Sequence, residues 1–245
     1  TGGTAIVALL RDQLVGQLRG EDSRAVAALV ARLRKSIHAL TPGCVSSTAL
    51  AAIDVALWDL AAKRAQTPLH LLLGGAQDRV RLYNTHVGWL NRPLDEMVAL
   101  SREAVERDRF TALKLKVGKP DPAEDVERVA RVREAVGDRV TLMVDANQSW
   151  TIDQAIARTR ALEPYHLYWM EEPLEATDLA GFVRLGQHIV TARAGGESLY
   201  GPAAFHEAVR QGALDILQPD VARVGGISAA LTVCHLAAAA NLPVA

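Results

Sequence analysis

The sequence predicts an α/β fold: a TIM-like (β/α) barrel preceded by the helical part of a smaller domain. Two observations predict it. From residue 79 onward, short apolar runs alternate with amphipathic helical segments, an order that favours a parallel sheet. Before that point, apolar residues recur at intervals of three and four with no strand-like run between them. We therefore expect two domains, 1–78 and 79–245.

The first domain is expected to be helical. Its periodic segments are 5–18, 25–40 and 47–65. Thr41–Cys44 (TPGC) should separate the second helix from the third, because proline and glycine interrupt helices. Thr67-Pro68 and Gly74-Gly75 should close the segment.

The second domain contains six candidate strands, with amphipathic helices at 93–108, 123–137 and 151–163 among the connections. The strand candidates are 80–86, 111–117, 140–145, 167–171, 191–197 and 214–220. A seventh strand is expected to start at Leu242. A barrel closes with eight strands and uses about 250 residues. We therefore expect a chain truncated at both ends, lacking the last quarter of the barrel and the start of the helical domain.

Composition favours a soluble protein that acts on a small molecule. The 245 residues are 49% hydrophobic and 22% charged, with a net charge of −1, which gives no argument for nucleic acid or membrane surfaces. Cys44 and Cys234 are far apart, which indicates a reducing compartment and no zinc site. No apolar stretch reaches the roughly 18 residues that span a bilayer. A cytoplasmic location is expected.

Three acidic residues each follow a short apolar run: Asp145, Glu171 and Glu197, spaced 26 residues apart. This spacing matches one strand-plus-helix unit. In a barrel it would place one carboxylate at the C-terminal end of each of three consecutive strands, where side chains converge. Three converging carboxylates repel one another unless a cation lies among them. Their hard oxygen atoms predict Mg²⁺ or a similar ion.

Two lysines are expected to act as the base. Lys114 and Lys116 lie two residues apart in one strand, so both should point into the barrel. Burial and the neighbouring like charge should lower a lysine pKa and give an amine that can accept a proton. Asp220, 23 residues after Glu197, ends the sixth run and should face these lysines.

Each assignment has a structural alternative. A carboxylate at a strand end can be a helix cap, Lys114 can be a surface lysine, and Asp220 can be a turn residue. Glu172 should point away from Glu171 and support it. Structural roles are also the simpler reading for residues at helical positions, namely Asp54, Trp58, Asp59, His206 and His235. Gly195 and Gly196 should allow a close backbone approach near the metal.

Several motifs together carry a family resemblance. KLKVG, MVDANQSW, WMEEPL, GGESLYGP and LQPDVARVGGIS resemble the mandelate racemase branch of the enolase superfamily, in the mandelate racemase/muconate lactonizing enzyme family. The segment AAIDVALWDLAAKRAQTPLHLLLGG resembles the last helix of that family's capping domain, so the resemblance covers essentially the whole chain. It implies an enolase-type modified barrel with an N-terminal α+β capping domain.

The resemblance also implies roles for the site residues. Asp145, Glu171 and Glu197 would bind Mg²⁺, and Lys116 would be a base with Lys114 beside it. Asp220 would pair with a histidine expected just beyond Ala245.

The implied reaction is Mg²⁺-dependent removal of the proton next to a carboxylate. The cation stabilises the dianionic enediolate, without which the proton is too weakly acidic for lysine. The runs YNTHVGWLNRPLDE and QPDVARVGGIS resemble acid-sugar dehydratases of the galactarate/talarate type. This favours dehydration of an acid sugar, an aldarate or aldonate, to a 2-keto-3-deoxy acid. His86, Asn147 and Arg223 lie near strand ends and are expected to contact the substrate. A homo-oligomer is expected.

The sequence also allows other functions. A second acid on the opposite face would return the proton, giving a racemase or epimerase of a 2-hydroxy acid. A non-catalytic pseudoenzyme of the same fold is another reading, against which the metal triad and the lysine pair both weigh. A phosphate-binding barrel is weaker, because no glycine-rich phosphate loop follows the late strands. The sequence leaves open whether His86 and Trp89 contact substrate or form a structural loop.

Overall fold

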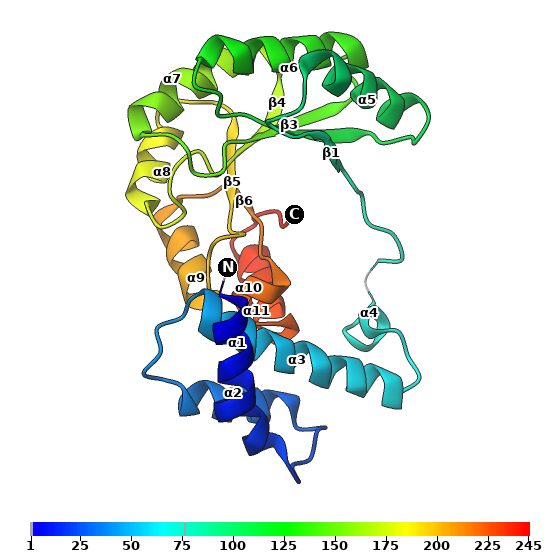
Figure 1. Ribbon diagram of the computed structural model, residues 1–245, viewed down its shortest axis with the longest axis vertical. Helices are drawn as coiled ribbons and strands as arrows, with labels where there is room; N and C mark the ends of the chain where they lie inside the picture. Colours follow the sequence, from blue (N-terminus) through cyan, green and yellow to red (C-terminus); the bar gives the residue numbers. More distant parts are fainter. Residues whose placement is uncertain (1, 76) are drawn as a thin grey trace. The chain divides into compact units, whose positions relative to one another are not determined.

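The computed structural model describes residues 2–75 and 77–245, which form two compact units (Figure 1). The first comprises the chain up to Arg79 together with Gly196–Arg210 and Leu217–Ala245. The second comprises Val80–Gly195 and Gln211–Ile216. These units are not the same division as the expected capping and barrel domains, whose boundary at residue 78 stays a prediction.

The first unit is helical at its N-terminal end, as the periodicity predicts. α1 continues through a π-helical segment, η1, and a 3₁₀ segment, η2, before α2, α3 and α4 follow. Their bounds are α1 Gly3–Leu9, η1 Leu10–Leu14, η2 Val15–Leu18, α2 Val26–Ser36, α3 Cys44–Arg64 and α4 Leu69–Leu72. Leu14, Leu33 and Ala49 are fully buried in the core that these helices share. The break at TPGC is confirmed, because α2 ends at Ser36 and α3 starts at Cys44.

α3 corrects one expectation. By length and composition it is apolar enough to cross a membrane, although the sequence suggested that no such stretch exists. The central helix of a packed domain passes the same test, and α3 contributes Leu50, Ile53 and Leu57 to the buried helical core.

α3 is joined to the C-terminal helices of the same unit by a buried carboxylate. These helices are α9 (Pro202–Gln211), α10 (Val221–Val224) and α11 (Ile227–Ala239). Asp54 accepts two hydrogen bonds from Ser228, one from the backbone N at 3.0 Å and one from the side-chain Oγ at 2.5 Å. Trp58 Nε1 donates to the same Oγ at 2.9 Å. A Cβ at Gly226 would overlap the Asp54 carboxylate. These contacts support the expected structural role of Asp54 and Trp58.

The second unit is built on a parallel sheet whose strands follow one another in chain order. The strands are β1 Asn84–Gly88, β2 Ala112–Lys116, β3 Thr141–Asp145, β4 Leu167–Glu171, β5 Ala192–Gly195 and β6 Ile216–Leu217. Helices α5, α6, α7 and α8 lie along one side of the sheet (Figure 1). Their bounds are Leu94–Glu106, Pro122–Val136, Ile152–Leu162 and Leu179–Gly186, and the 3₁₀ segment η3 covers Glu163–Tyr165. Parallel strands in sequential order, each followed by a helix, are the arrangement of a TIM-like barrel.

Side chains alternate between the two sides of the sheet, so the leucines and the lysines of β2 lie on opposite sides. Leu113 and Leu115 of β2, with Leu142 and Val144 of β3, are buried on one side of the sheet. Lys114 is the register partner of Met143 on the other side, where Met143, Trp169, Ala194 and Ile216 form a cluster. The period of two thus leaves the lysines and carboxylates on the side of this cluster, opposite the leucines.

Two strands differ from their expected bounds. β1 begins at Asn84 instead of residue 80, and both Val80 and Leu82 are largely exposed, so this apolar run is not buried by the sheet. β6 is only two residues long, because Pro219 has no N–H to donate and Asp220 already caps α10. The expected start of a seventh strand is confirmed by a parallel bridge between Leu217 and Val244.

Candidate active site

Three chemically active side chains end three neighbouring strands. Lys116 is the register partner of Asp145, and Asp145 is the register partner of Glu171. Because the strands are parallel, these three residues lie at the same edge of the sheet. Asp145 and Glu171 are each only 1% exposed. The fold therefore holds two buried carboxylates and an amine at the C-terminal ends of β2, β3 and β4.

The two lysines contact these carboxylates directly. Lys116 Nζ lies 2.5 Å from Asp145 Oδ2. Lys114 Nζ lies 2.5 Å from Glu171 Oε1 and 3.3 Å from Asp145 Oδ2. Trp169 Nε1 donates to the other oxygen of Glu171, Oε2, at 3.1 Å. Two amines and two carboxylates thus form one compact cluster.

The electrostatics of this cluster correct one expectation. Burial alone would lower the pKa of Lys114, but the charges of Glu171 and Asp145 and the hydrogen bond to Glu171 outweigh it. The pKa of Lys114 is therefore raised, not lowered as the sequence suggested. Burial would likewise raise the pKa of Asp145, but the hydrogen bond from Lys116 and the charge of Lys114 bring it below its usual value.

The donor set fits a hard divalent cation in part. Asp145 and Glu171 offer buried carboxylate oxygens at one point, which is the ligand type that Mg²⁺ prefers. Within residues 2–75 and 77–245, no group of three or more His, Cys, Asp and Glu side chains is arranged to hold a metal ion. The structure brings together two of the three expected ligands, and Glu197 as the third stays a prediction.

Glu197 belongs to the first unit and follows a glycine that the fold requires. Gly196 has φ +131°, and a Cβ there would lie 2.6 Å from a Phe205 ring carbon and 3.0 Å from the carbonyl of Gln218. Arg223 Nη1 is 2.9 Å from the Glu197 carbonyl oxygen and 3.6 Å from its carboxylate. Arg223, expected to contact substrate, is thus bound to an expected metal ligand.

Asp220 acts as a helix cap in this structure. Its carboxylate accepts a hydrogen bond from the backbone N of Arg223 at 2.9 Å, at the start of α10. This is the turn-like role that the sequence allowed as an alternative. The acid/base role of Asp220 stays a prediction.

The other expected substrate contacts are exposed residues, His86 in the middle of β1 and Asn147 two residues after the end of β3. His86 is on β1, and its carbonyl accepts a hydrogen bond from Arg92 at 3.3 Å. Asn147 has φ +44°, and its backbone N donates to Asp145 Oδ1 at 2.8 Å. Asn147 therefore orients a carboxylate of the cluster through its backbone. Substrate contact by either side chain stays a prediction.

Glu172 forms a hydrogen bond with Gln148, a residue outside the cluster. Glu172 Oε2 accepts this bond from Gln148 Nε2 at 2.7 Å, and Glu172 is buried. At Gly195, expected to allow a close backbone approach, a Cβ would lie 3.3 Å from Leu214 Cδ2 and 3.6 Å from Glu172 Cγ.

The structure adds aromatic neighbours that sequence reasoning left open or missed. The ring of Trp89 lies beneath Lys116 Nζ, 6.0 Å from the ammonium to the ring centre. Tyr83 lies 5.7 Å from Lys114 Nζ in the same way. Trp169 could have been found from the sequence, because it precedes Glu171 by two residues and must share its side of the strand.

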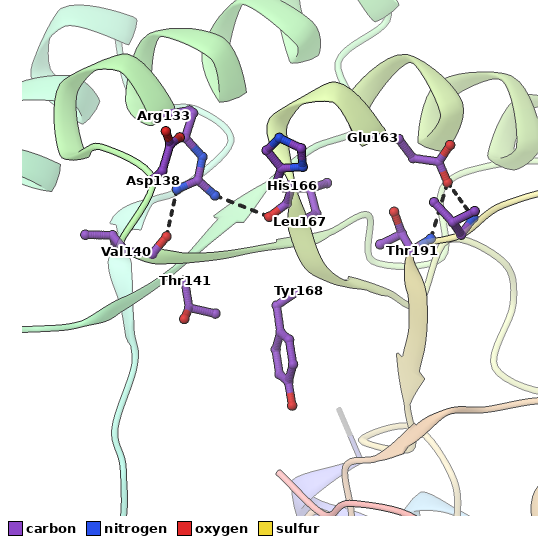
Figure 2. Close-up of a pocket in the computed structure, with 10 residues that line it drawn as sticks. Arg133, Asp138, Val140, Thr141, Glu163, His166, Leu167, Tyr168 and Thr191 are labelled. Carbon is purple, nitrogen blue, oxygen red and sulfur yellow. Dashed lines mark hydrogen bonds between the residues drawn. The ribbon is translucent and has the colours of Figure 1, made fainter.

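A cavity lies at the opposite ends of the strands from the lysine and carboxylate cluster (Figure 2). It has a volume of about 420 Å³, and its lining includes Arg133, Glu163 and Tyr168. Arg133 donates to the carbonyls of Val140 and His166, at 2.7 and 3.3 Å. Glu163 accepts hydrogen bonds from the backbone N atoms of Val190 and Thr191. These charged groups join strands to helices at the end of the barrel that contributes stability.

Comparison with known proteins agrees with this geometry. The profile "Enolase C-terminal domain-like" matches residues 96–245, and the profile "Mandelate racemase / muconate lactonizing enzyme, N-terminal domain" matches residues 2–74. The chain is 40% identical over 240 residues to L-talarate/galactarate dehydratase of Salmonella typhimurium, covering 97% of this chain and 59% of that protein. It is 39% identical to 3,6-anhydro-alpha-L-galactonate cycloisomerase of Streptomyces coelicolor, covering 98% of this chain and 66% of that protein. The chain thus spans roughly three fifths to two thirds of these relatives.

Solved structures give the same result. L-Talarate dehydratase from Polaromonas sp. JS666, complexed with Mg and L-glucarate, matches the whole chain with a TM-score of 0.94 and 41% identity, over 68% of its own length. A racemase from Streptomyces coelicolor A3(2) with bound magnesium matches with a TM-score of 0.95 and 38% identity, over 72% of its length. The relatives include dehydratases, cycloisomerases and epimerases. The chain belongs to the mandelate racemase/muconate lactonizing enzyme family, in the mandelate racemase branch of the enolase superfamily.

Proposed function

We propose that the protein is a Mg²⁺-dependent lyase that removes the proton next to the carboxylate of an acid sugar and dehydrates the sugar to a 2-keto-3-deoxy acid. The observation that carries this proposal is the placement of Lys116 beside Asp145 and Glu171 at one edge of a parallel sheet. The relatedness to L-talarate/galactarate dehydratase supports the choice of dehydration.

Asp145 and Glu171 would hold the metal, with Glu197 as the third ligand. When bound, Mg²⁺ supplies positive charge that stabilises the negative charge developing on the substrate carboxylate as the proton leaves. The burial of both carboxylates supports this assignment, because electrostatic interactions are stronger where water is excluded.

Lys116 would be the base that takes the proton through Nζ. Its side chain is partly buried and ends at the strand edge, where a substrate can reach it. Lys114 lies one pleat deeper, and its contacts to both carboxylates suit it to orient them. The two lysines would therefore have different tasks, with proton transfer assigned to Lys116.

Dehydration also needs an acid for the leaving group. As the C–H bond next to the carboxylate breaks, the proton passes to Lys116 Nζ. The bond between carbon 3 and its hydroxyl breaks next, and that oxygen takes a proton to leave as water. The enol product then rearranges to the 2-keto acid. Asp220 would orient a histidine as this acid. His86, Asn147 and Arg223 would bind the sugar hydroxyls and distal carboxylate.

The cytoplasmic location, a homo-oligomeric state and the absence of nucleic-acid and membrane partners stay predictions. Size-exclusion chromatography with light scattering would decide the oligomeric state. A mass of one chain would contradict that expectation without bearing on the chemistry.

A screen of acid sugars with the full-length protein and Mg²⁺ tests the proposed reaction. Aldarates and aldonates are incubated with enzyme, and 2-keto acid formation is followed colorimetrically. We expect turnover of at least one acid sugar that disappears in the Lys116→Ala variant. Keto-acid formation by Lys116→Ala at the wild-type rate would contradict the assigned base.

A racemase or epimerase is the second candidate, favoured by relatives such as the hydrophobic dipeptide epimerase of Enterococcus faecalis, 34% identical over 79% of this chain. Inversion at the carbon next to the carboxylate, without keto-acid formation, would support this candidate over dehydration.

A further inference from the structure

We propose that Asp125 and Arg128 of α6 are positioning residues that hold the loops after β1 and β2 and, through those loops, fix Lys116 for proton transfer. The inference rests on the proposed function for the role of Lys116. The two residues lie three positions apart, on one face of the helix. Both are buried, with 2% and 5% of their surfaces exposed.

Asp125 holds the loop that leaves β2. Its Oδ2 accepts a hydrogen bond from the backbone N of Gly118 at 2.9 Å. The backbone N of Lys119 donates to both of its oxygens, at 3.1 and 3.2 Å. Gly118 is two residues beyond Lys116, so the carboxylate fixes the chain immediately after the proposed base.

Arg158 of α7 holds the same loop from its carbonyl side. Its Nη1 donates to the carbonyl of Lys119 at 2.7 Å and lies 3.4 Å from Asp125 Oδ2. Its Nη2 donates to the carbonyl of Pro120 at 3.1 Å. A buried carboxylate and a partly buried guanidinium thus bind backbone donors and acceptors of residues 118–120.

Arg128 holds the loop that leaves β1. Its Nη2 donates to the carbonyl of Trp89 at 2.9 Å, and its Nη1 donates to the carbonyl of Arg92 at 3.0 Å. The ring of Trp89 lies 6.0 Å from Lys116 Nζ. One turn of α6 therefore fixes both the backbone after Lys116 and the aromatic ring beside its ammonium.

The choice of charged residues here favours positioning over simple stability. Burial raises the pKa of Asp125, although the hydrogen bonds from Gly118 and Lys119 and the charge of Arg158 oppose the shift. Well-packed apolar residues often stabilise a buried position as well as charges do. Charges add directional bonds, and a misplacement of about 1 Å at a reacting group can cost about 100-fold in rate.

The test compares Asp125→Asn and Arg128→Gln with two matched controls on exposed parts of the same helix. Glu127→Gln removes a carboxylate, and Arg131→Gln removes a guanidinium. The full-length protein is assayed with Mg²⁺ and the acid sugar that the wild type turns over, carrying hydrogen or deuterium next to the carboxylate. Amide hydrogen exchange is measured at Gly118 and Lys119.

We expect kcat to fall about 10- to 100-fold in both test variants, together with a larger deuterium isotope effect. The isotope effect should rise because proton removal becomes slower relative to the other steps, which a lower folded fraction alone would not cause. The Gly118 and Lys119 amides should exchange faster in Asp125→Asn, and both controls should match the wild type.

An unchanged isotope effect in both variants, or unchanged amide exchange in Asp125→Asn, would overturn the proposal. If the wild type turns over no acid sugar, the proposed function fails. The amide exchange of Asp125→Asn then still decides whether this carboxylate holds the loop.

Discussion

Lys116 and Asp145 are register partners at the ends of neighbouring parallel strands, and Lys116 Nζ lies 2.5 Å from Asp145 Oδ2. The backbone continues this pairing, because the N of Val117 donates to the carbonyl of Asp145 at 2.9 Å. The proposed base and a proposed metal ligand are therefore positioned by one hydrogen-bond ladder.

Replacing Lys116 should remove the base without removing the metal site. We expect Lys116→Ala to lower kcat by about 10²- to 10⁴-fold, the range for general base catalysis. Mg²⁺ affinity, measured by isothermal titration calorimetry, should not weaken, because the substitution removes a positive charge beside Asp145. Lys119→Ala is the matched control and should retain activity. Substantially weaker Mg²⁺ binding by Lys116→Ala would contradict this separation of roles.

The two adjacent glutamates should differ in their effect on metal binding. Glu171 faces the cluster, while Glu172 is bonded to Gln148. We expect Glu171→Gln to weaken Mg²⁺ binding at least 10-fold, since loss of a carboxylate ligand costs more than about 1.4 kcal/mol. Glu172→Gln should bind Mg²⁺ within about two-fold of the wild type. Equal losses in the two variants, measured by calorimetry, would argue against Glu171 as a ligand.

Asp54 should be a main source of stability in the first unit. It is fully buried and accepts two hydrogen bonds from Ser228. We expect Asp54→Ala to lower the free energy of unfolding by about 1–3 kcal/mol, because the partly buried donors of Ser228 lose their acceptor. Asp59→Ala, on an exposed part of α3 where Asp59 pairs with Lys63, should change it by less than about 1 kcal/mol. Urea unfolding measures the loss of unfolding free energy in both variants. Similar losses would contradict the stabilising role assigned to Asp54.

The Arg193–Asp215 pair should give the second unit a specific pH dependence. Burial would raise the pKa of Asp215, but bonds from the backbone and side chain of Arg193 lower it. A carboxyl pKa that is lower in the folded state contributes stability above its unfolded value, about 3.9, and loses it as the pH falls through the folded value. Because Asp215 is partly exposed, we expect Asp215→Asn to cost only about 1 kcal/mol at pH 7.

The difference in unfolding free energy between wild type and Asp215→Asn should shrink below about pH 4. Asp153→Asn is the control, because Asp153 forms an exposed pair with Arg184 and should contribute little at any pH. Urea titrations at pH 7, 5 and 3.5 measure the difference. A difference that stays constant over this range would show that the ionised carboxylate is not the source.

The sequence predicted most elements because their periods are strong. The strands holding Lys114, Asp145 and Glu171 are bounded within one residue of expectation, since alternation fixes which side is buried. The first strand was misplaced because Val80 and Leu82 look strand-like, although the structure leaves them exposed. Apolar composition does not show whether a neighbouring strand is available to pair.

The electrostatics of the site could not be predicted with the same success. Two lysines in one strand suggested mutual repulsion, whereas the carboxylates of the next strands contact Lys114 and raise its pKa. Asp125 and Arg128 were missed because charged residues on an amphipathic helix usually face solvent. They are buried because they bind the loops after β1 and β2, and local periodicity in the sequence does not reveal such contacts.

The most direct test is exchange of the proton next to the carboxylate in heavy water. The full-length protein is incubated with Mg²⁺ and an acid sugar, and deuterium incorporation into substrate and product is followed by NMR. We predict incorporation at that carbon by the wild type, abolished by EDTA and by Lys116→Ala. Incorporation at an undiminished rate after either treatment would contradict the claim that a metal-activated carboxylate loses its proton to Lys116.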